Sequence, residues 1–175
     1  MAEVNEEIAR VYFEELGYTV RTNLYYKKKS GLGTGPADID LLILKPQGKG
    51  KYGKKAIVSV KGWHSFTFSL RLMKKSGRLF EMFVPQSIRR AEDFLGKGFK
   101  RILIVAKTPK DKKEKVLIKK WLAKRMKIDF LLEFSEILSE LIKRTDNKRN
   151  YPNSEVQQTI RLLKNYKFLT KKKLI

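Results

Sequence analysis

Two short and nearly continuous apolar runs constrain the fold of this 175-residue chain more than any other feature. They are Ile39–Leu44 and Arg101–Ala106. Runs of this length and composition are typical of strands buried on both faces, and they are far too short to span a bilayer. We therefore predict an α/β fold built around one mixed sheet.

A helix and a hairpin are expected around the first run. Asn5 is the predicted N-cap of a helix that Gly17 ends, and residues 18–26 are predicted to be extended. A basic, glycine-rich turn at 47–55 leads into Ala56–Lys61. We expect this segment to pair with the first run as a β-hairpin.

Further strands and helices are predicted around the second run. Apolar residues alternate with polar ones at 66–72 and again at 80–84, which predicts a second, inserted hairpin. Pro85 then begins a helix that Gly96 ends. The crossover leads to the second run as a parallel strand.

The C-terminal part alternates in the same way. Residues 110–125 predict a very basic helix, residues 128–134 a strand, and Ser135 the N-cap of another helix. A polar stretch without periodicity follows. We therefore divide the chain into a domain at 1–144 and a basic helical extension at 145–175.

The charge balance indicates a polyanionic partner. The chain has 40 Lys and Arg residues against 18 Asp and Glu residues, a net charge of +22 at pH 7. Its apolar and aromatic content argues against a disordered basic tail. We expect it to bind nucleic acid.

Other compositional features narrow the chemistry. The chain has no cysteine and a single histidine, which excludes disulfides, thiol nucleophiles and zinc sites rich in Cys or His. A hard cation held by carboxylates remains. The acidic N-terminus has no signal-like apolar run, so we expect a soluble, cytoplasmic protein without a membrane segment.

Acidic and basic residues occur at corresponding ends of the two predicted hairpin strands. Asp38 and Asp40 share one face of their strand, and Ser59 and Lys61 share one face of the next. If these faces align, Asp40 and Lys61 meet at one edge of the sheet. The alternative is a lysine that snorkels to solvent at a strand end.

Three short motifs follow one another in a defined order. They read Glu6-Glu-Ile-Ala-Arg-Val-Tyr-Phe-Glu-Glu-Leu-Gly17-Tyr18, then Asp38-Ile-Asp40-Leu41-Leu42, then Ile57-Val-Ser-Val-Lys61. Over about residues 5–107 this order resembles the PD-(D/E)XK nuclease superfamily, especially the archaeal Holliday junction resolvases. The resemblance implies a restriction-endonuclease-like mixed sheet flanked by helices, here followed by a C-terminal helical appendage.

The resemblance also implies roles for individual residues. Glu6 and Asp40 would hold one or two Mg²⁺ or Mn²⁺ ions, assisted by the carbonyl of Val60, and Lys61 would orient or activate water. The alternatives are a first-turn acid that favours the helix dipole for Glu6 and a solvated strand end for Asp40.

One position departs from the family pattern, because Ser59 replaces the usual second carboxylate of the Glu-x-Lys motif. A hydroxyl is a poor substitute for an anionic ligand. The candidates to replace it are Asp38, Glu81 and Glu92. His64 is an auxiliary candidate for contacting phosphate or acting as a base, and its alternative is an ordinary surface residue.

Basic and aromatic residues near the motifs extend the predicted interface. Seven lysines are expected to flank the site from two sides, namely Lys27, Lys28, Lys29, Lys49, Lys51, Lys54 and Lys55. Trp63, Phe66 and Phe68 lie just beyond Lys61. We interpret them first as core or dimer interface, with base stacking as the alternative.

These observations favour a metal-dependent DNA endonuclease that is structure-selective or repair-associated, acting on double-stranded or branched DNA. A homodimer would suit such substrates. One alternative is a catalytically weakened, nucleic-acid-binding module of the same fold. Another is a basic RNA-binding protein, which would explain the charge but not the pairing of Asp40 with Lys61.

Overall fold

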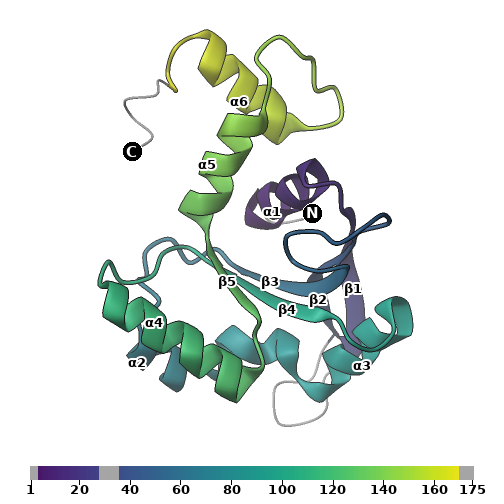
Figure 1. Ribbon diagram of the computed structural model, residues 1–175, viewed down its shortest axis with the longest axis vertical. Helices are drawn as coiled ribbons and strands as arrows, with labels where there is room; N and C mark the ends of the chain where they lie inside the picture. Colours follow the sequence, from purple (N-terminus) through teal and green to yellow (C-terminus); the bar gives the residue numbers. More distant parts are fainter. Residues whose placement is uncertain (1–3, 28–35, 170–175) are drawn as a thin grey trace.

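The computed structural model describes residues 4–27 and 36–169, which form a mixed sheet between two layers of helices (Figure 1). The strands are β1 (Thr19–Lys27), β2 (Pro36–Leu44), β3 (Lys55–Lys61), β4 (Lys100–Val105) and β5 (Phe130–Glu133). The helices are α1 (Val4–Glu15), α2 (Leu70–Lys75), α3 (Pro85–Leu95), α4 (Lys112–Trp121), α5 (Phe134–Arg144) and α6 (Glu155–Asn165), with a 3₁₀ helix η1 (Gly77–Phe83) and a π-helical turn η2 (Leu122–Met126). The predicted α/β class is confirmed.

The five strands lie in chain order across the sheet. β1, β2 and β3 are antiparallel, whereas β3, β4 and β5 are parallel. The predicted hairpin of β2 with β3 and the predicted parallel strand β4 are therefore confirmed. Because β3, β4 and β5 run the same way, their carboxyl ends meet at one edge of the sheet, where side chains from all three strands come close together.

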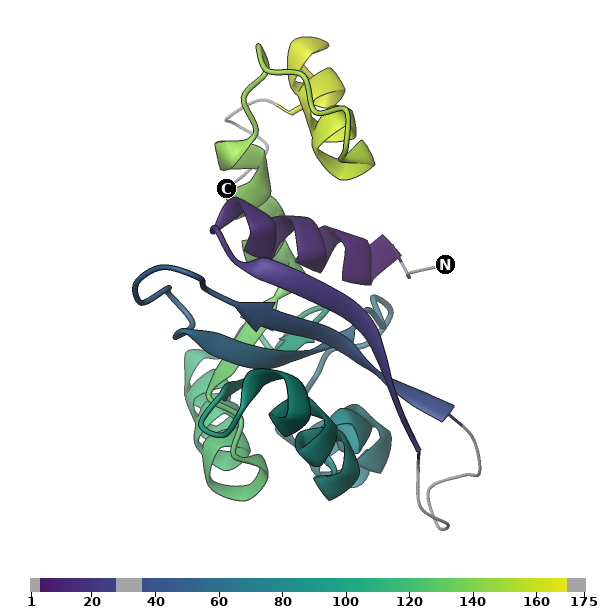
Figure 2. The same cartoon turned by 90° about the vertical axis from the view of Figure 1, so that its right-hand side faces the viewer.

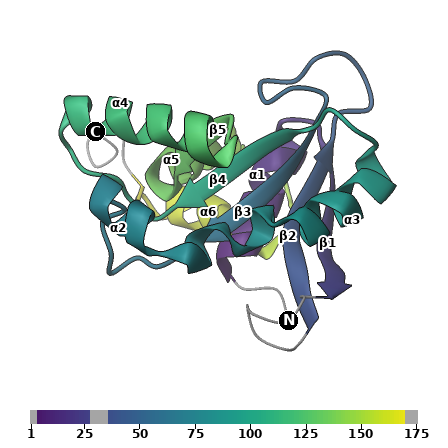
Figure 3. The ribbon, with the colours of Figure 1, turned by 90° about the horizontal axis from the view of Figure 1, so that it is seen from below.

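Each face of the sheet has its own apolar core. α1 and α5 cover one face, and the core there includes Phe13, Leu41 and Val58 (Figure 2). α2, α3 and α4 cover the other face, where the core includes Ile57 and Leu103 (Figure 3). The strand that carries both Leu41 and its neighbour Leu42 thus packs on both sides, as its nearly continuous apolar run predicted.

Several predicted boundaries agree with the structure. Gly17, with φ of 76°, follows α1, and the N–H of Tyr18 donates to the carbonyl of Phe13. Pro85 is the first residue of α3, and Gly96, with φ of 66°, is its C-cap. Glycine at a helix C-terminus and proline at a first helical position both follow the known backbone preferences of these residues.

Three predictions of local structure are wrong. The second hairpin is absent, because residues 66–84 contain α2 and η1 instead of two strands. Asn5 lies inside α1 rather than at its N-cap. Ser135 lies inside α5, whose N-cap is Glu133, paired reciprocally with Glu136 as a capping box.

The C-terminal segment packs on α1 and α5. Gln157 of α6 donates to Glu15 of α1 at 2.7 Å. Lys164 donates to the carbonyls of Ile142 and Thr145 at the end of α5, where backbone acceptors lack helical partners. Ile160 belongs to the same core as α1, so residues 145–169 of the extension predicted at 145–175 are attached through both apolar and polar contacts.

Tyr18 fixes the turn that joins β2 to β3. Its phenol oxygen accepts from the backbone N–H of Tyr52 and donates to the carbonyl of Gly53, each at 3.0 Å. Tyr18→Phe leaves the buried N–H of Tyr52 without this acceptor, so we expect a loss of about 1–3 kcal/mol in the free energy of unfolding. Urea denaturation measures it.

Tyr25→Phe is the matched control, because the side chain of Tyr25 is exposed on β1. We expect it to change the free energy of unfolding by less than about 0.5 kcal/mol. Equal denaturation midpoints for the two variants would contradict the role given to Tyr18.

Candidate functional site

The site begins where β2 and β3 separate. Their ladder runs from Leu44 opposite Lys55 to Leu41 opposite Val58 and stops before Asp40. There, Oδ2 of Asp40 accepts from the backbone N–H of Val60 at 2.6 Å. A side-chain carboxylate thus replaces the backbone acceptor that a continued ladder would supply.

The backbone of Asp40 is also released from β1. The β1–β2 register pairs the residues on either side of Asp40 but omits Asp40 itself, whose counterpart Asn23 has φ of 54°. The N–H of Asp40 donates instead to the sulfur of Met82 in η1, at 3.3 Å. Asp40 therefore lies on β2, between β1 and β3, but is paired in neither the β1–β2 ladder nor the β2–β3 ladder.

Ser59 and Lys61 share the face of β3 that meets this carboxylate. The hydroxyl of Ser59 donates to Oδ2 of Asp40 at 3.4 Å, and Nζ of Lys61 lies 4.0 Å from the same oxygen. The hairpin thus brings Asp40 and Lys61 together, as the strand faces predicted, and places Ser59 beside them. Lys61 is half-buried and keeps part of its side chain in contact with solvent, whereas Ser59 is fully buried.

The electrostatics of Asp40 are unusual for a strand end. Only 8% of the residue is exposed, and this burial raises the pKa of its carboxyl group above the ordinary value. The charge of Lys61 and the hydrogen bonds from Val60 and Ser59 oppose that rise, while the charge of Asp38 adds to it. The alternative of a solvated strand end is wrong for Asp40.

Two further carboxylates lie near Asp40, around the phenol of Tyr26. Tyr26 donates to the backbone carbonyl of Glu81 at 3.1 Å. Burial raises the pKa of Tyr26 to about 12, and the charges of Glu81, Asp40 and Asp38 add to the rise. Asp38 is exposed and Glu81 half-buried. Within the described ranges 4–27 and 36–169, no group of three or more His, Cys, Asp or Glu residues has the arrangement of a metal site.

The N-terminal turn of α1 lies against the loop that follows β3. Nε2 of His64 lies 2.9 Å from Oδ1 of Asn5, and the His64 ring packs against Phe134 at 5.2 Å. A Cβ atom on Gly62 would overlap the Asn5 side chain, so glycine permits this approach. Glu6, half-buried in the same turn, is thereby placed at the Lys61 end of β3.

The predicted lysines lie at two ends of the sheet. Lys27 ends β1 opposite Pro36, at the end of β2 that carries Asp38. Lys28 and Lys29 lie outside the described residues. Lys49, Lys51 and Lys54 belong to the turn after Leu44, four residues and about 13 Å along β2 from Asp40.

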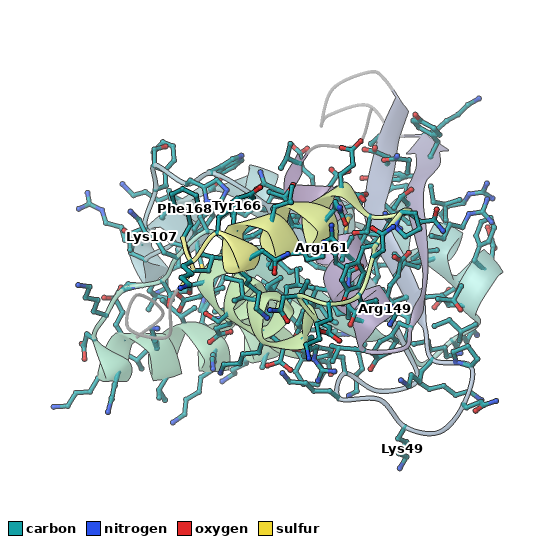
Figure 4. The ribbon with its side chains drawn as sticks, turned by 90° about the horizontal axis from the view of Figure 1, so that it is seen from above. Lys49, Lys107, Arg149, Arg161, Tyr166 and Phe168 are labelled. Carbon is teal, nitrogen blue, oxygen red and sulfur yellow. The ribbon has the colours of Figure 1, made fainter. Side chains whose placement is uncertain are left out.

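The turn lysines therefore do not flank Asp40 and Lys61, contrary to the prediction. Figure 4 shows Lys49 on the side of the molecule away from Lys107, which follows β4 at the carboxyl ends of the parallel strands. Lys55 donates to the carbonyl of Leu95 at the end of α3, and Lys51 lies 3.4 Å from the phenol of Tyr12. These two side chains have structural contacts.

Glu133 is a charged residue of this edge that the sequence analysis missed. It is level with Lys61 across β4, because Val105 pairs with both residues. Burial favours a higher pKa for Glu133, but hydrogen bonds from Lys115 at 2.7 Å and from Thr108 outweigh it and lower the pKa. The carboxylate is thus committed to Lys115, Thr108 and the cap of α5. Two features of the sequence indicated its place: it follows a buried strand, and Glu136 three residues later fits a capping box.

Comparisons with protein-family models, curated proteins and solved structures find no match to this chain. The assignment of function therefore rests on the residues described above. No helix within the described part of the chain has the length and apolar character needed to cross a membrane.

Removing the charge of Asp40 is expected to stabilise the protein. The raised pKa means that the folded chain binds the proton more tightly than the unfolded chain, so the wild type loses stability as the pH rises above 3.8. Asp40→Asn keeps an oxygen for the N–H of Val60 and loses the buried charge. We expect the Tm at pH 7 to rise by roughly 2–4 °C, the effect of about 1 kcal/mol in a chain of this size.

The gain should shrink as the pH falls toward 3.8, because the raised pKa lets Asp40 of the folded wild type bind its proton before that pH is reached. Thermal unfolding from pH 3.5 to 7.5 measures this dependence. Asp93→Asn, at an exposed acid of α3, is the control and should show no comparable gain. A lower Tm for Asp40→Asn at pH 7 would contradict the prediction.

Proposed function

We propose that this protein is a metal-dependent DNA endonuclease of the PD-(D/E)XK type. The observation that carries the proposal is the carboxylate of Asp40, held by the N–H of Val60 between the separated ends of β2 and β3, with the ammonium of Lys61 at 4.0 Å. A buried acid with a raised pKa beside a lysine is costly to the fold, and such costs concentrate at functional sites. The basic net charge of +22 fits a polyanionic substrate.

The donor atoms at this site suit a hard cation. Mg²⁺ and Mn²⁺ prefer oxygen ligands, and Mg²⁺ is commonly held by one or two carboxylates together with water and substrate phosphate. Asp40 and Asp38 supply such carboxylates. When bound, the cation would supply an activated water and neutralise charge on the scissile phosphate. It would also favour the ionised form of Asp40, which burial disfavours.

Asp38 is the strongest candidate to replace the carboxylate missing at Ser59. Its charge acts directly on Asp40, and its exposed position leaves it accessible to a phosphate group. Glu81 also lies beside Tyr26, because its backbone carbonyl accepts from the phenol and its charge adds to the rise of the phenol pKa. Glu6 lies in the first turn of α1, at the end of β3 that carries Lys61.

Lys61 acts by charge and by hydrogen bonding. Its ammonium lies close to Asp40 and remains partly open to solvent, so it can contact both an ordered water and a phosphate oxygen. A cation in a partly buried setting stabilises the negative charge that develops during phosphodiester hydrolysis. Its three N–H donors also orient a water molecule.

The binding-module alternative shares every feature of this proposal except cleavage. In this alternative no carboxylate replaces the one that is missing at Ser59. A site without a second carboxylate would bind DNA without hydrolysing it. The RNA-binding alternative leaves the buried pair of Asp40 and Lys61 without a role.

Substitution of the central pair tests cleavage. With Mg²⁺ or Mn²⁺ and a branched DNA, we expect Asp40→Asn to reduce cleavage to background and Lys61→Ala to reduce it by roughly 10²–10³-fold. DNA affinity should persist in Asp40→Asn or increase, because a negative charge near phosphate is removed. Asp93→Asn and Lys97→Ala are matched controls on the exposed surface and should cleave like the wild type.

Asp38 and Ser59 separate the two versions of the proposal. If Asp38 replaces the missing carboxylate, Asp38→Asn abolishes cleavage and Ser59→Glu helps little. If the site is crippled, Ser59→Glu raises cleavage and Asp38→Asn is nearly silent. A wild type that cuts no linear, branched or single-stranded DNA, and stays inert after Ser59→Glu, would leave the binding module as the function.

The salt dependence of DNA binding tests where the DNA lies. Replacing Lys27, Lys28 and Lys29 with Ala should reduce the magnitude of the slope of log K against log salt by up to ~3 if all three neutralise phosphates, because Lys27 ends β1 at the end of the sheet that carries Asp38. Replacing Lys49, Lys51 and Lys54 removes the same charge at the other end of the sheet and should change the slope much less. The opposite ranking would place the DNA over the turn.

A further inference from the structure

An exposed aromatic pair lies directly after Lys61. Trp63 is 38% exposed and Phe66 is 53% exposed, and their ring centroids lie 6.4 Å apart. Phe68, by contrast, is fully buried in the core beneath α2 and α3. Of the predicted core or dimer-interface role, the core part is thus confirmed for Phe68 and wrong for Trp63 and Phe66, which stand on a loop and not on a strand. For Trp63 and Phe66 the dimer-interface part stays a prediction.

Phe68 holds the ring of Trp63 in place. The two rings are stacked, with centroids 5.9 Å apart and an angle of 22° between their planes. Because buried Phe68 covers one face of the Trp63 ring, the exposed part of Trp63 belongs to its other face and its edges. The exposed part of the Trp63 ring is therefore held by its stacking on Phe68, which limits the entropy lost when a ligand stacks on it.

Two basic residues lie near this pair. Lys61 precedes it by two residues, and the carbonyl of Lys107 accepts from the N–H of Phe68 at 2.9 Å. Lys107 is exposed at the carboxyl end of β4 (Figure 4). Protein–protein interface cores are depleted of lysine, whereas sites for single-stranded nucleic acid combine aromatic platforms with cationic side chains.

We infer that Trp63 and Phe66 form a stacking platform for unpaired bases of a DNA strand whose phosphates reach Lys61 and Lys107. This inference rests on the proposed nuclease function and specifies its substrate class. The preferred DNA carries unpaired bases beside the scissile phosphate, as at a fork, a flap or an open junction. A fully paired duplex keeps its bases stacked within the helix and offers no base face to Trp63.

Binding without metal tests the platform separately from cleavage. In EDTA, the full chain with Trp121→Phe retains Trp63 as its single tryptophan, and its fluorescence is followed during titration with a dT oligonucleotide and with a blunt duplex at one salt concentration. We expect the single strand to quench Trp63 strongly and the duplex to quench it weakly, because stacking brings the base into contact with the indole.

Substitutions of Trp63 and Phe66 measure how much the platform contributes to the affinity for single-stranded DNA. Trp63→Ala and Phe66→Ala should each weaken dT binding by roughly 5–150-fold, the range that follows from about 1–3 kcal/mol per stacked base, while duplex affinity changes by less than about twofold. Trp63→Phe should retain most of the affinity. The control is Phe94→Ala, because Phe94 is 40% exposed at the end of α3, beyond the opposite end of β3.

Three results would overturn the platform. The first is unchanged dT affinity in both Trp63→Ala and Phe66→Ala, with circular dichroism showing both variants folded. The second is an equal loss of single-strand and duplex affinity. The third is a dimer in sedimentation that Phe66→Ala dissociates without changing dT affinity, which would make the pair an interface between two copies. A wild type that prefers single strands but cleaves nothing overturns only the nuclease proposal.

Discussion

A carboxylate buried between two strands governs the local structure around it. The side chain of Asp40 accepts from Val60 where the β2–β3 ladder stops, and Asn23, its unpaired counterpart within β1, has φ of 54°. The charge of Lys61 offsets part of the desolvation cost of Asp40, and the backbone N–H of Asp40 donates to the sulfur of Met82. The two apolar cores hold this arrangement in place, because the strands on which it depends are buried on both faces.

The sequence predicted the parts of the fold that rest on long apolar runs and on backbone preferences. Ile39–Leu44 and Arg101–Ala106 lie in buried strands, and Pro85 and Gly96 bound α3. The failure at 66–84 has a physical cause. Short apolar segments fit a period of two as well as a helical period, and here Ser69 caps α2 by accepting from Leu72.

The site was predictable only in its polar strand residues. Ser59 and Lys61 share a face of β3 by alternation alone, and Asp40 of the paired strand β2 lies beside them because the two faces align. Met82 and Tyr26 reach Asp40 through packing that no local pattern encodes. The lysines of the β2–β3 turn were wrongly predicted to flank the site. They follow β2 closely in sequence, but they lie at the end of the strand away from Asp40.

The contacts of α1 with the last helix bear on how the chain folds during its synthesis. Gln157 follows its partner Glu15 by 142 residues in the chain, and Ile160 belongs to the core that α1 shares. These contacts can form only after α6 has been translated, when the strands of the sheet and α5 have already been made. Until then, the side of α1 that α6 covers remains open, so association with other chains at this surface is the expected risk during synthesis.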